Sequence, residues 1–308
     1  MPGLEEAEKW YRATVAPALE AEFPELVQRI AAGLAGRGSE CFGFDDDISR
    51  DHDFRVGVSL WVSDEDEARY GFALGRLYEK LVRSSFPELK VAGSKLGPSE
   101  HGVVRISDFY RRHIGIPGVP QNWQEWLYTP EYAFAEAVNG RIFRDDMGLF
   151  SRIRNAILHD MPEDVRLKKI AARVISMAQS GQYNFTRCLK HGEPGAAYLA
   201  LTEFVKSTVS LVFLLNFSFA PYYKWCFRAM KELPRFSWMK DDLEFLLTGT
   251  SGTENKSAVI EKICSAIIEE LAEQGLSDRK DDYLEPHAFE IMKKIRSREL
   301  RELHVMEG

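Results

Sequence analysis

The chain has 308 residues, of which 45% are hydrophobic, and a formal net charge of −7 at pH 7. A chain of this length can bury a sizeable core and commonly forms two domains. The acidic balance argues against a protein that binds long nucleic acids through a basic face, although it leaves a local basic groove open. The four cysteines are scattered without a CxxC pair, which indicates reduced thiols in a cytoplasmic protein and neither a zinc site nor a disulfide framework.

Apolar residues recur at helical spacing over the first 35 residues, which predicts helices broken near Pro17 and Pro24. The next stretch, GSECFGFDDDISRDHDF at 38–54, is a loop rich in carboxylates. Apolar and polar residues then alternate strictly in FRVGVSLWV at 54–62, which predicts a strand with one face in the core.

A helix and a shorter strand are predicted after this first strand. Ser63 followed by Asp66 is typical of a capping box that opens a helix. GVVRIS at 102–107 predicts the shorter strand.

From about Trp123 onward the pattern predicts helices alone. MPEDVRLKKIAARVISMAQ at 161–179 carries Pro162 and two acids at its start, both helix-start signals, and Gly275 is a predicted C-cap. The most apolar run, 209–220, is shorter than the roughly 20 residues of a membrane span, so we expect a buried helix and no membrane partner. We therefore predict an α+β protein, with a mixed-sheet α/β domain at 1–122 and an all-α helical bundle at 123–308.

The carboxylates of the acidic loop are candidates for a metal site. Asp51 and Asp53 share one face if the strand extends back to them, and two carboxylates so placed repel each other unless a cation bridges them. Mg²⁺ prefers oxygen ligands, and two such ions about 4 Å apart suit phosphoryl-type chemistry. The alternative is a solvated acidic loop. A calcium loop fails on spacing, because Arg50 would occupy its glycine position.

Two further groups of residues are candidates for binding a nucleotide. Backbone N–H groups at Gly38 and Ser39 can cradle phosphate oxygens ahead of the metal pair. Aromatic side chains near the start of the helical region can stack on a base or pack at the domain junction; they are Trp123, Trp126, Tyr128 and Tyr132.

The combination of GS at 38–39, Gly43 and SRDHD at 49–53 resembles the signature of the polymerase-β nucleotidyltransferase superfamily. The wider chain, with PEDVRLKKIAA, QSGQYNF, LLNFSFAPYYKW and FRAMKELP, is similar to a bacterial nucleotidyltransferase-like family of unassigned function, DUF4037. The layout also resembles the antibiotic nucleotidyltransferases, in which a helical domain closes over the nucleotide.

The resemblance implies roles for particular residues. Asp51 and Asp53 would hold one or two Mg²⁺ ions, and Gly38 and Ser39 would hold the β- and γ-phosphates. The signature also covers Ser49. An Asn…Lys-Trp pattern in the antibiotic enzymes corresponds to Asn216 and Lys224, and the lysine would lie near the triphosphate.

The third carboxylate of such sites is not evident in this sequence. GVVRIS contains no acid, and Asp108, which follows it, is the candidate. Gln182, in the polar stretch SGQYNFTR, either faces the nucleotide or takes part in a polar network between helices.

These observations predict a nucleotidyltransferase that uses Mg²⁺ and a nucleoside triphosphate, with ATP as the first candidate. It would transfer the nucleotidyl group to an acceptor and release pyrophosphate. The acceptor stays open among a small molecule, a protein and a tRNA end. The alternatives are an inactive nucleotide-binding or regulatory protein that keeps the fold, and an antitoxin-like enzyme that modifies a partner protein.

Overall fold

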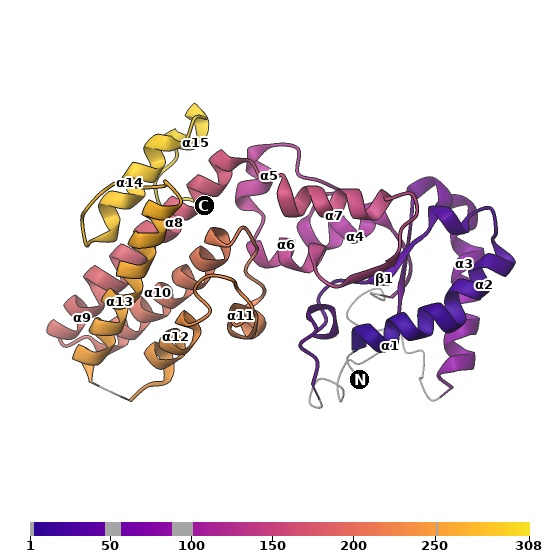
Figure 1. Ribbon diagram of the computed structural model, residues 1–308, viewed down its shortest axis with the longest axis horizontal. Coiled ribbons are helices and arrows are strands. Elements are labelled where there is room, and N and C mark those ends of the chain that lie inside the picture. Colours follow the sequence, from indigo (N-terminus) through magenta and orange to yellow (C-terminus); the bar gives the residue numbers. More distant parts are fainter. Residues whose placement is uncertain (1–2, 47–56, 88–100, 251) are drawn as a thin grey trace. The chain divides into compact units, whose positions relative to one another are not determined.

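The computed structural model describes residues 3–46, 57–87, 101–250 and 252–308. The chain divides into two compact units, each described by itself below: Met1–Gln121 with Ala133–Asp160, and Asn122–Tyr132 with Met161–Gly308. The predicted α+β class is confirmed, because the first unit contains a mixed sheet with helices and the second is helical (Figure 1).

Within the described residues, the sheet of the first unit has four strands in the order β3-β2-β1-β4. The strands are β1 (Ala31–Leu34), β2 (Ser59–Val62), β3 (Gly102–Arg105) and β4 (Arg141–Arg144). β1 pairs antiparallel with β2 and with β4, whereas β2 and β3 are parallel. Gly33 lies opposite Ser59, so the end of β1 is beside the start of β2. Residues 133–160 were predicted to belong to the helical region, but they lie in the first unit because β4 pairs with β1.

One face of the sheet packs on the helices that flank β1 and β2 in the sequence. These elements are α1 (Gly3–Trp10), the π-helix η1 (Tyr11–Val15), α2 (Ala16–Glu22), the 3₁₀ turn η2 (Val27–Arg29) and α3 (Asp64–Ser85). Trp10, Leu19, Leu60 and Leu74 belong to the resulting hydrophobic cluster. Burial of such side chains is the main favourable term in the folding of this unit.

The predicted helix start at Ser63 is confirmed in detail. Its hydroxyl accepts a hydrogen bond from the main-chain N–H of Asp66 at 3.0 Å and donates one to the Asp66 carboxylate at 2.8 Å. The Asp66 carboxylate is buried and lies 2.5 Å from the Arg29 guanidinium, which supplies the opposite charge that a buried carboxylate needs.

The prediction of helix throughout the first 35 residues is wrong for β1. Helix α2 ends at Glu22, and all four residues of β1 are buried between β2 and β4. The apolar spacing cannot distinguish the two structures here, because a short, fully buried strand shows no alternation. The turn at Gly38 and Ser39 therefore follows a strand and not a helix.

The second face of the sheet is also buried, which corrects the prediction that β2 has one face in the core. Trp61 is fully buried and stacks on Phe150 with ring centroids 3.9 Å apart, and Phe109 meets its indole edge-on. These rings come from α4 (Ile106–Ile114) and α7 (Leu149–His159). A central strand covered by helices on both sides buries both sets of side chains, whatever its alternation.

The second unit is built around α8 (Glu163–Met177), which packs on α10 (Pro194–Leu215) and α14 (Leu284–Lys294). Its other helices are α5 (Trp123–Tyr128), the π-helix η5 (Ala178–Phe185), α9 (Thr186–Lys190), α11 (Tyr223–Met230), α12 (Met239–Thr248), α13 (Thr253–Glu273) and α15 (Arg298–Glu302). Helix α6 (Glu131–Val138) begins in this unit, and its residues from Ala133 onward belong to the first. Gly275 has a φ of 66° just after α13, which confirms the predicted C-cap.

Helix α10 is long and apolar enough, by length and composition, to cross a membrane. Its apolar stretch is largely buried within the second unit, against α8, η5 and α12. Packing of this kind is what the core helix of a globular unit shows.

Candidate functional site

The turn at Gly38 and Ser39 lies between β1 and the 3₁₀ helix η3 (Glu40–Phe42). The carbonyl of Ser39 accepts hydrogen bonds from the main-chain N–H groups of Phe42 and Phe44. The N–H groups of Gly38 and Ser39 donate to no acceptor in the described part of the chain, as the first donors of a helical turn commonly do. The turn therefore presents two main-chain donors.

Glu40 covers this turn. A Cβ on Gly38 would overlap the Glu40 carboxylate, so the carboxylate lies directly against the glycine. The hydroxyl of Ser39 makes only a long contact of 3.5 Å with the same carboxylate. A phosphate could reach the turn only after the Glu40 side chain rotates away.

Three predicted site residues, Ser49, Asp51 and Asp53, lie outside the described residues. Among the described residues, no group of three or more His, Cys, Asp or Glu side chains could hold a metal ion. Asp51 and Asp53 stay predicted metal ligands.

Asp108 lies in the first turn of α4, and its carboxylate pairs with Arg111 at 2.7 Å. Because β2 and β3 are parallel, with Ser59 opposite Gly102, the two strands start at the same edge of the sheet. Asp108 comes after the end of β3, at the opposite edge from the start of β2.

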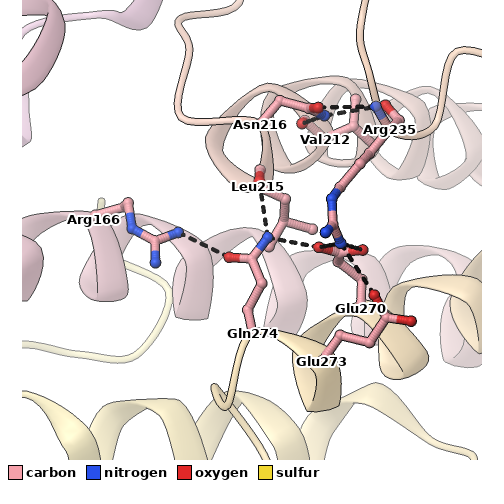
Figure 2. A network of polar contacts seen from close by, with 8 residues as sticks. All are labelled: Arg166, Val212, Leu215, Asn216, Arg235, Glu270, Glu273 and Gln274. Atoms are coloured by element: carbon pink, nitrogen blue, oxygen red, sulfur yellow. Dashed lines mark hydrogen bonds and ion pairs between the residues drawn. The ribbon is translucent and has the colours of Figure 1, made fainter.

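Asn216, at the end of α10, is engaged by the main chain (Figure 2). Its side-chain amide donates to the carbonyls of Val212 and Arg235 at 2.7 and 3.1 Å, and its oxygen accepts from the Arg235 N–H at 3.0 Å. Arg235 in turn pairs with the carboxylates of Glu270 and Glu273. Asn216 thus links the end of α10 to the loop before α12 and keeps no free amide proton.

Gln182 makes a similar set of contacts in η5. It donates to the Glu261 carboxylate at 2.8 Å and to the Asp282 carbonyl at 3.1 Å, and it accepts from the Leu284 N–H at 2.9 Å. These bonds are those of the polar network that the sequence analysis gave as one of its two alternatives.

Lys224 is exposed on α11, with its ammonium 5.3 Å from the centre of the Trp225 ring. This contact is a cation–π interaction at an exposed site, which contributes about 0.5–1 kcal/mol at most. The charge of Lys224 therefore stays available to a ligand.

The helical unit contains a pocket of about 890 Å³. Its lining is mostly apolar, with side chains from α10, α11 and the segment 127–132. Tyr132, Tyr222 and Tyr223 form an aromatic wall: Tyr222 lies 5.5 Å from Tyr132 and 4.4 Å from Tyr223, measured between ring centroids. All three rings are at least 40% exposed, so a ligand in the pocket could reach them.

The polar wall of the pocket is formed by α8 and α10. Lys169 is 2% exposed, and its ammonium donates one hydrogen bond within the described residues, to the Leu127 carbonyl at 2.9 Å. Arg173, one turn later, donates from Nε to the Ser210 hydroxyl at 2.8 Å. Ser210 donates to the Glu131 carboxylate at 2.7 Å, and the Arg173 guanidinium lies 3.8 Å from the same carboxylate.

Burial governs the electrostatics of this wall. Desolvation lowers the pKa of Lys169, while the negative charge of Glu131 opposes the shift and Arg173 adds to it. Lys169, Arg173 and Glu131 together leave an excess of one positive charge when all three are ionised. At the rim, Glu203 pairs with Lys206 at 3.1 Å and does not offset that excess.

The residues of the polar wall were missed by the sequence analysis. Lys168 and Lys169 follow Leu167 in α8, and lysine side chains are mostly exposed in folded proteins. Both are buried instead, because α8 packs on neighbours on opposite sides. The spacing of Lys169 and Arg173, four residues apart on one helix face, was the one available signal.

The fold and the pocket define the class of protein: an α+β chain with a mixed-sheet unit and a helical unit that contains a partly aromatic, partly cationic pocket. Residues 126–226 match the model of a family described as a domain of unknown function, DUF4037. No curated protein and no solved structure matches the chain.

The match confirms the resemblance to the DUF4037 family over 101 of the 308 residues. It includes all but four of the residues that line the pocket, and it does not reach Gly38, Ser39 or the two aspartates. The resemblance to the polymerase-β superfamily stays a prediction.

Proposed function

We propose that the protein is a Mg²⁺-dependent nucleotidyltransferase that transfers the nucleoside monophosphate of ATP to an acceptor hydroxyl and releases pyrophosphate. The P–O bond between the α- and β-phosphates breaks, a new P–O bond forms to the acceptor oxygen, and the acceptor proton is released. The proposal combines the sequence signature at 38–53 with the arrangement of the sheet.

One topological observation carries the proposal. The turn with Gly38 and Ser39 follows the end of β1, and the segment with Asp51 and Asp53 precedes β2. Antiparallel pairing puts the end of β1 beside the start of β2, with Gly33 opposite Ser59. The turn with Gly38 and Ser39 and the start of β2 therefore lie at one edge of the sheet, which supports a metal–triphosphate site there.

The chain's own residues would supply binding and orientation. The N–H groups of Gly38 and Ser39 would donate to the outer phosphates once Glu40 has rotated away. Mg²⁺, held by Asp51 and Asp53, would supply charge neutralisation and a template for the reacting oxygens. The contacts of Asn216 and Gln182 are satisfied within the helical unit, which favours a structural role for both.

A second candidate function is supported by the position of Asp108. If the third carboxylate is missing from the edge where β2 begins, the site would bind a metal–nucleotide without transferring it. The protein would then be a nucleotide-binding or regulatory protein that keeps the fold.

The test is a calorimetric titration of Mg²⁺–ATP into the wild type and into Asp51→Asn and Asp53→Asn. Both variants should lose binding by at least tenfold and keep their thermal stability without metal, because removal of one carboxylate relieves repulsion. Asp278→Asn, at an exposed position far along the chain, is the matched control. Normal binding in either aspartate variant would reject the metal site.

Turnover decides between the two candidates. Release of pyrophosphate from ATP in the presence of an acceptor, lost in Asp51→Asn, supports the transferase. The binding protein is supported if Mg²⁺–ATP binds tightly but ATP releases no pyrophosphate with any acceptor tested. The acceptors to test are hydroxyl compounds, proteins and tRNA.

A further inference from the structure

The pocket of the helical unit has two chemically distinct parts. One is apolar and aromatic, with Val209, Phe227 and the tyrosines Tyr132, Tyr222 and Tyr223 in its lining. The other is the polar wall of Lys169 and Arg173. A volume of about 890 Å³ falls in the range typical of sites for small organic molecules.

The two cations of the polar wall are held in place, but not all of their N–H donors are used by the described residues. Ser210 and Glu131 fix the Arg173 guanidinium from one side, while the Lys169 ammonium has three protons and makes one hydrogen bond, to Leu127. A buried ammonium with unused donors is costly unless an acceptor reaches it. A ligand anion at this wall would provide those acceptors.

The carboxylates of Glu203 and Glu307, which also line the pocket, are engaged elsewhere and do not serve as the acceptor for Lys169. Glu203 pairs with Lys206 at the rim. The Glu307 carboxylate accepts from the Tyr128 hydroxyl at 2.5 Å, and its charge acts on Lys168.

We propose that this pocket is a binding site for a small organic anion with an aromatic body. The ring would lie against the tyrosine wall, and the anionic group, a carboxylate or a phosphate, would be received by Lys169 and Arg173. All the residues of the site belong to the helical unit, so the inference does not rest on the proposed nucleotidyl transfer.

The probe is 1-anilinonaphthalene-8-sulfonate, and its matched control is N-phenyl-1-naphthylamine, which has the same rings without the sulfonate. Fluorescence titration of the full chain at neutral pH should give a lower Kd for the sulfonate than for the neutral dye. Lys169→Met, which keeps the length of the side chain, should raise the sulfonate Kd about tenfold and leave the neutral dye unchanged. Lys280→Met, at an exposed position outside the lining of the pocket, should change neither.

A second variant keeps the test decisive if Lys169→Met does not fold. Val209 is 7% exposed and lines the pocket, so Val209→Phe narrows the apolar part without touching a charge. It should weaken both dyes at least fivefold. Equal affinity of the two dyes for the wild type, or unchanged sulfonate binding in both variants, would overturn the proposal.

Displacement of the bound sulfonate identifies the anionic group. Phenyl phosphate and phenylacetate carry the two candidate groups on one ring, and benzyl alcohol is the neutral control. Displacement by phenyl phosphate or phenylacetate, and not by benzyl alcohol, supports the proposal, and the stronger of the two identifies the preferred head group. Equal displacement by all three would show that charge plays no part.

Discussion

Replacement of Asn216 by alanine separates a structural role from a nucleotide-binding role, because the two roles predict opposite results. The substitution removes three hydrogen bonds, to the Val212 carbonyl and to both main-chain groups of Arg235. Each contributes about 1 kcal/mol net, and water replaces part of the loss at this half-exposed site, so the expected destabilisation is about 2 kcal/mol. In a unit of 159 residues this lowers the midpoint of thermal unfolding by about 4–8 °C.

Asn216→Asp is the sharper companion variant. It keeps the size and the acceptor of the side chain but loses both N–H donors, and its carboxylate would face the carbonyls of Val212 and Arg235. We expect it to destabilise the unit at least as much as alanine does. Glu232→Ala, at an exposed position in the loop that Asn216 holds, should be neutral within about 0.5 kcal/mol.

Thermal unfolding followed by circular dichroism gives the stability of each variant, and calorimetry with Mg²⁺–ATP well below the transition gives the affinity. A structural role predicts lower stability with unchanged affinity in the folded protein. Unchanged stability with a loss of affinity of tenfold or more would refute the structural role. It would indicate that Asn216 binds the nucleotide.

The remaining predictions concern three other positions. Gly33→Ala should destabilise the first unit by roughly 1–3 kcal/mol in urea unfolding, because a Cβ there would overlap the Arg141 carbonyl of β4; a neutral result would mean that the strands can separate. Burial lowers the pKa of Lys168 from 10.5 to about 8, so between those values the unfolded chain binds a proton that the folded chain does not. Stability should therefore rise from pH 8 to 9.5 in the wild type relative to Lys168→Met, and parallel curves would contradict this. Glu40→Gln should tighten Mg²⁺–ATP binding several-fold, because the carboxylate that covers Gly38 repels phosphate; weaker binding would exclude a phosphate at this turn.

Local signals in the sequence determined the ends of several elements. The start of α3 at Ser63 and the end of α13 before Gly275 were both predicted, because a capping hydroxyl and a left-handed glycine act within a few residues of the chain. The order of the two regions followed from the same kind of pattern, since the alternation of β2 gives way to helical spacing after Trp123.

Burial on two sides was decided only by the tertiary structure. β1 was predicted as helix because the packing that buries it comes from β2 and β4, the latter more than 100 residues away. Trp61 was expected to lie opposite the core, yet Phe150 covers it. Neither β4 nor Phe150 can be predicted as a packing partner from the local sequence pattern.

The pocket shows the same limit for function. Lys169 and Arg173 are charged residues of one helix, and they form the polar wall because α10 brings Ser210, α5 brings Leu127 and the start of α6 brings Glu131 to them. Hydrogen bonds between residues 37–79 positions apart are set by how helices pack, and no local rule predicts that packing. The sequence alone therefore determined where helices and turns begin and end, while the tertiary structure determined which charges are buried together.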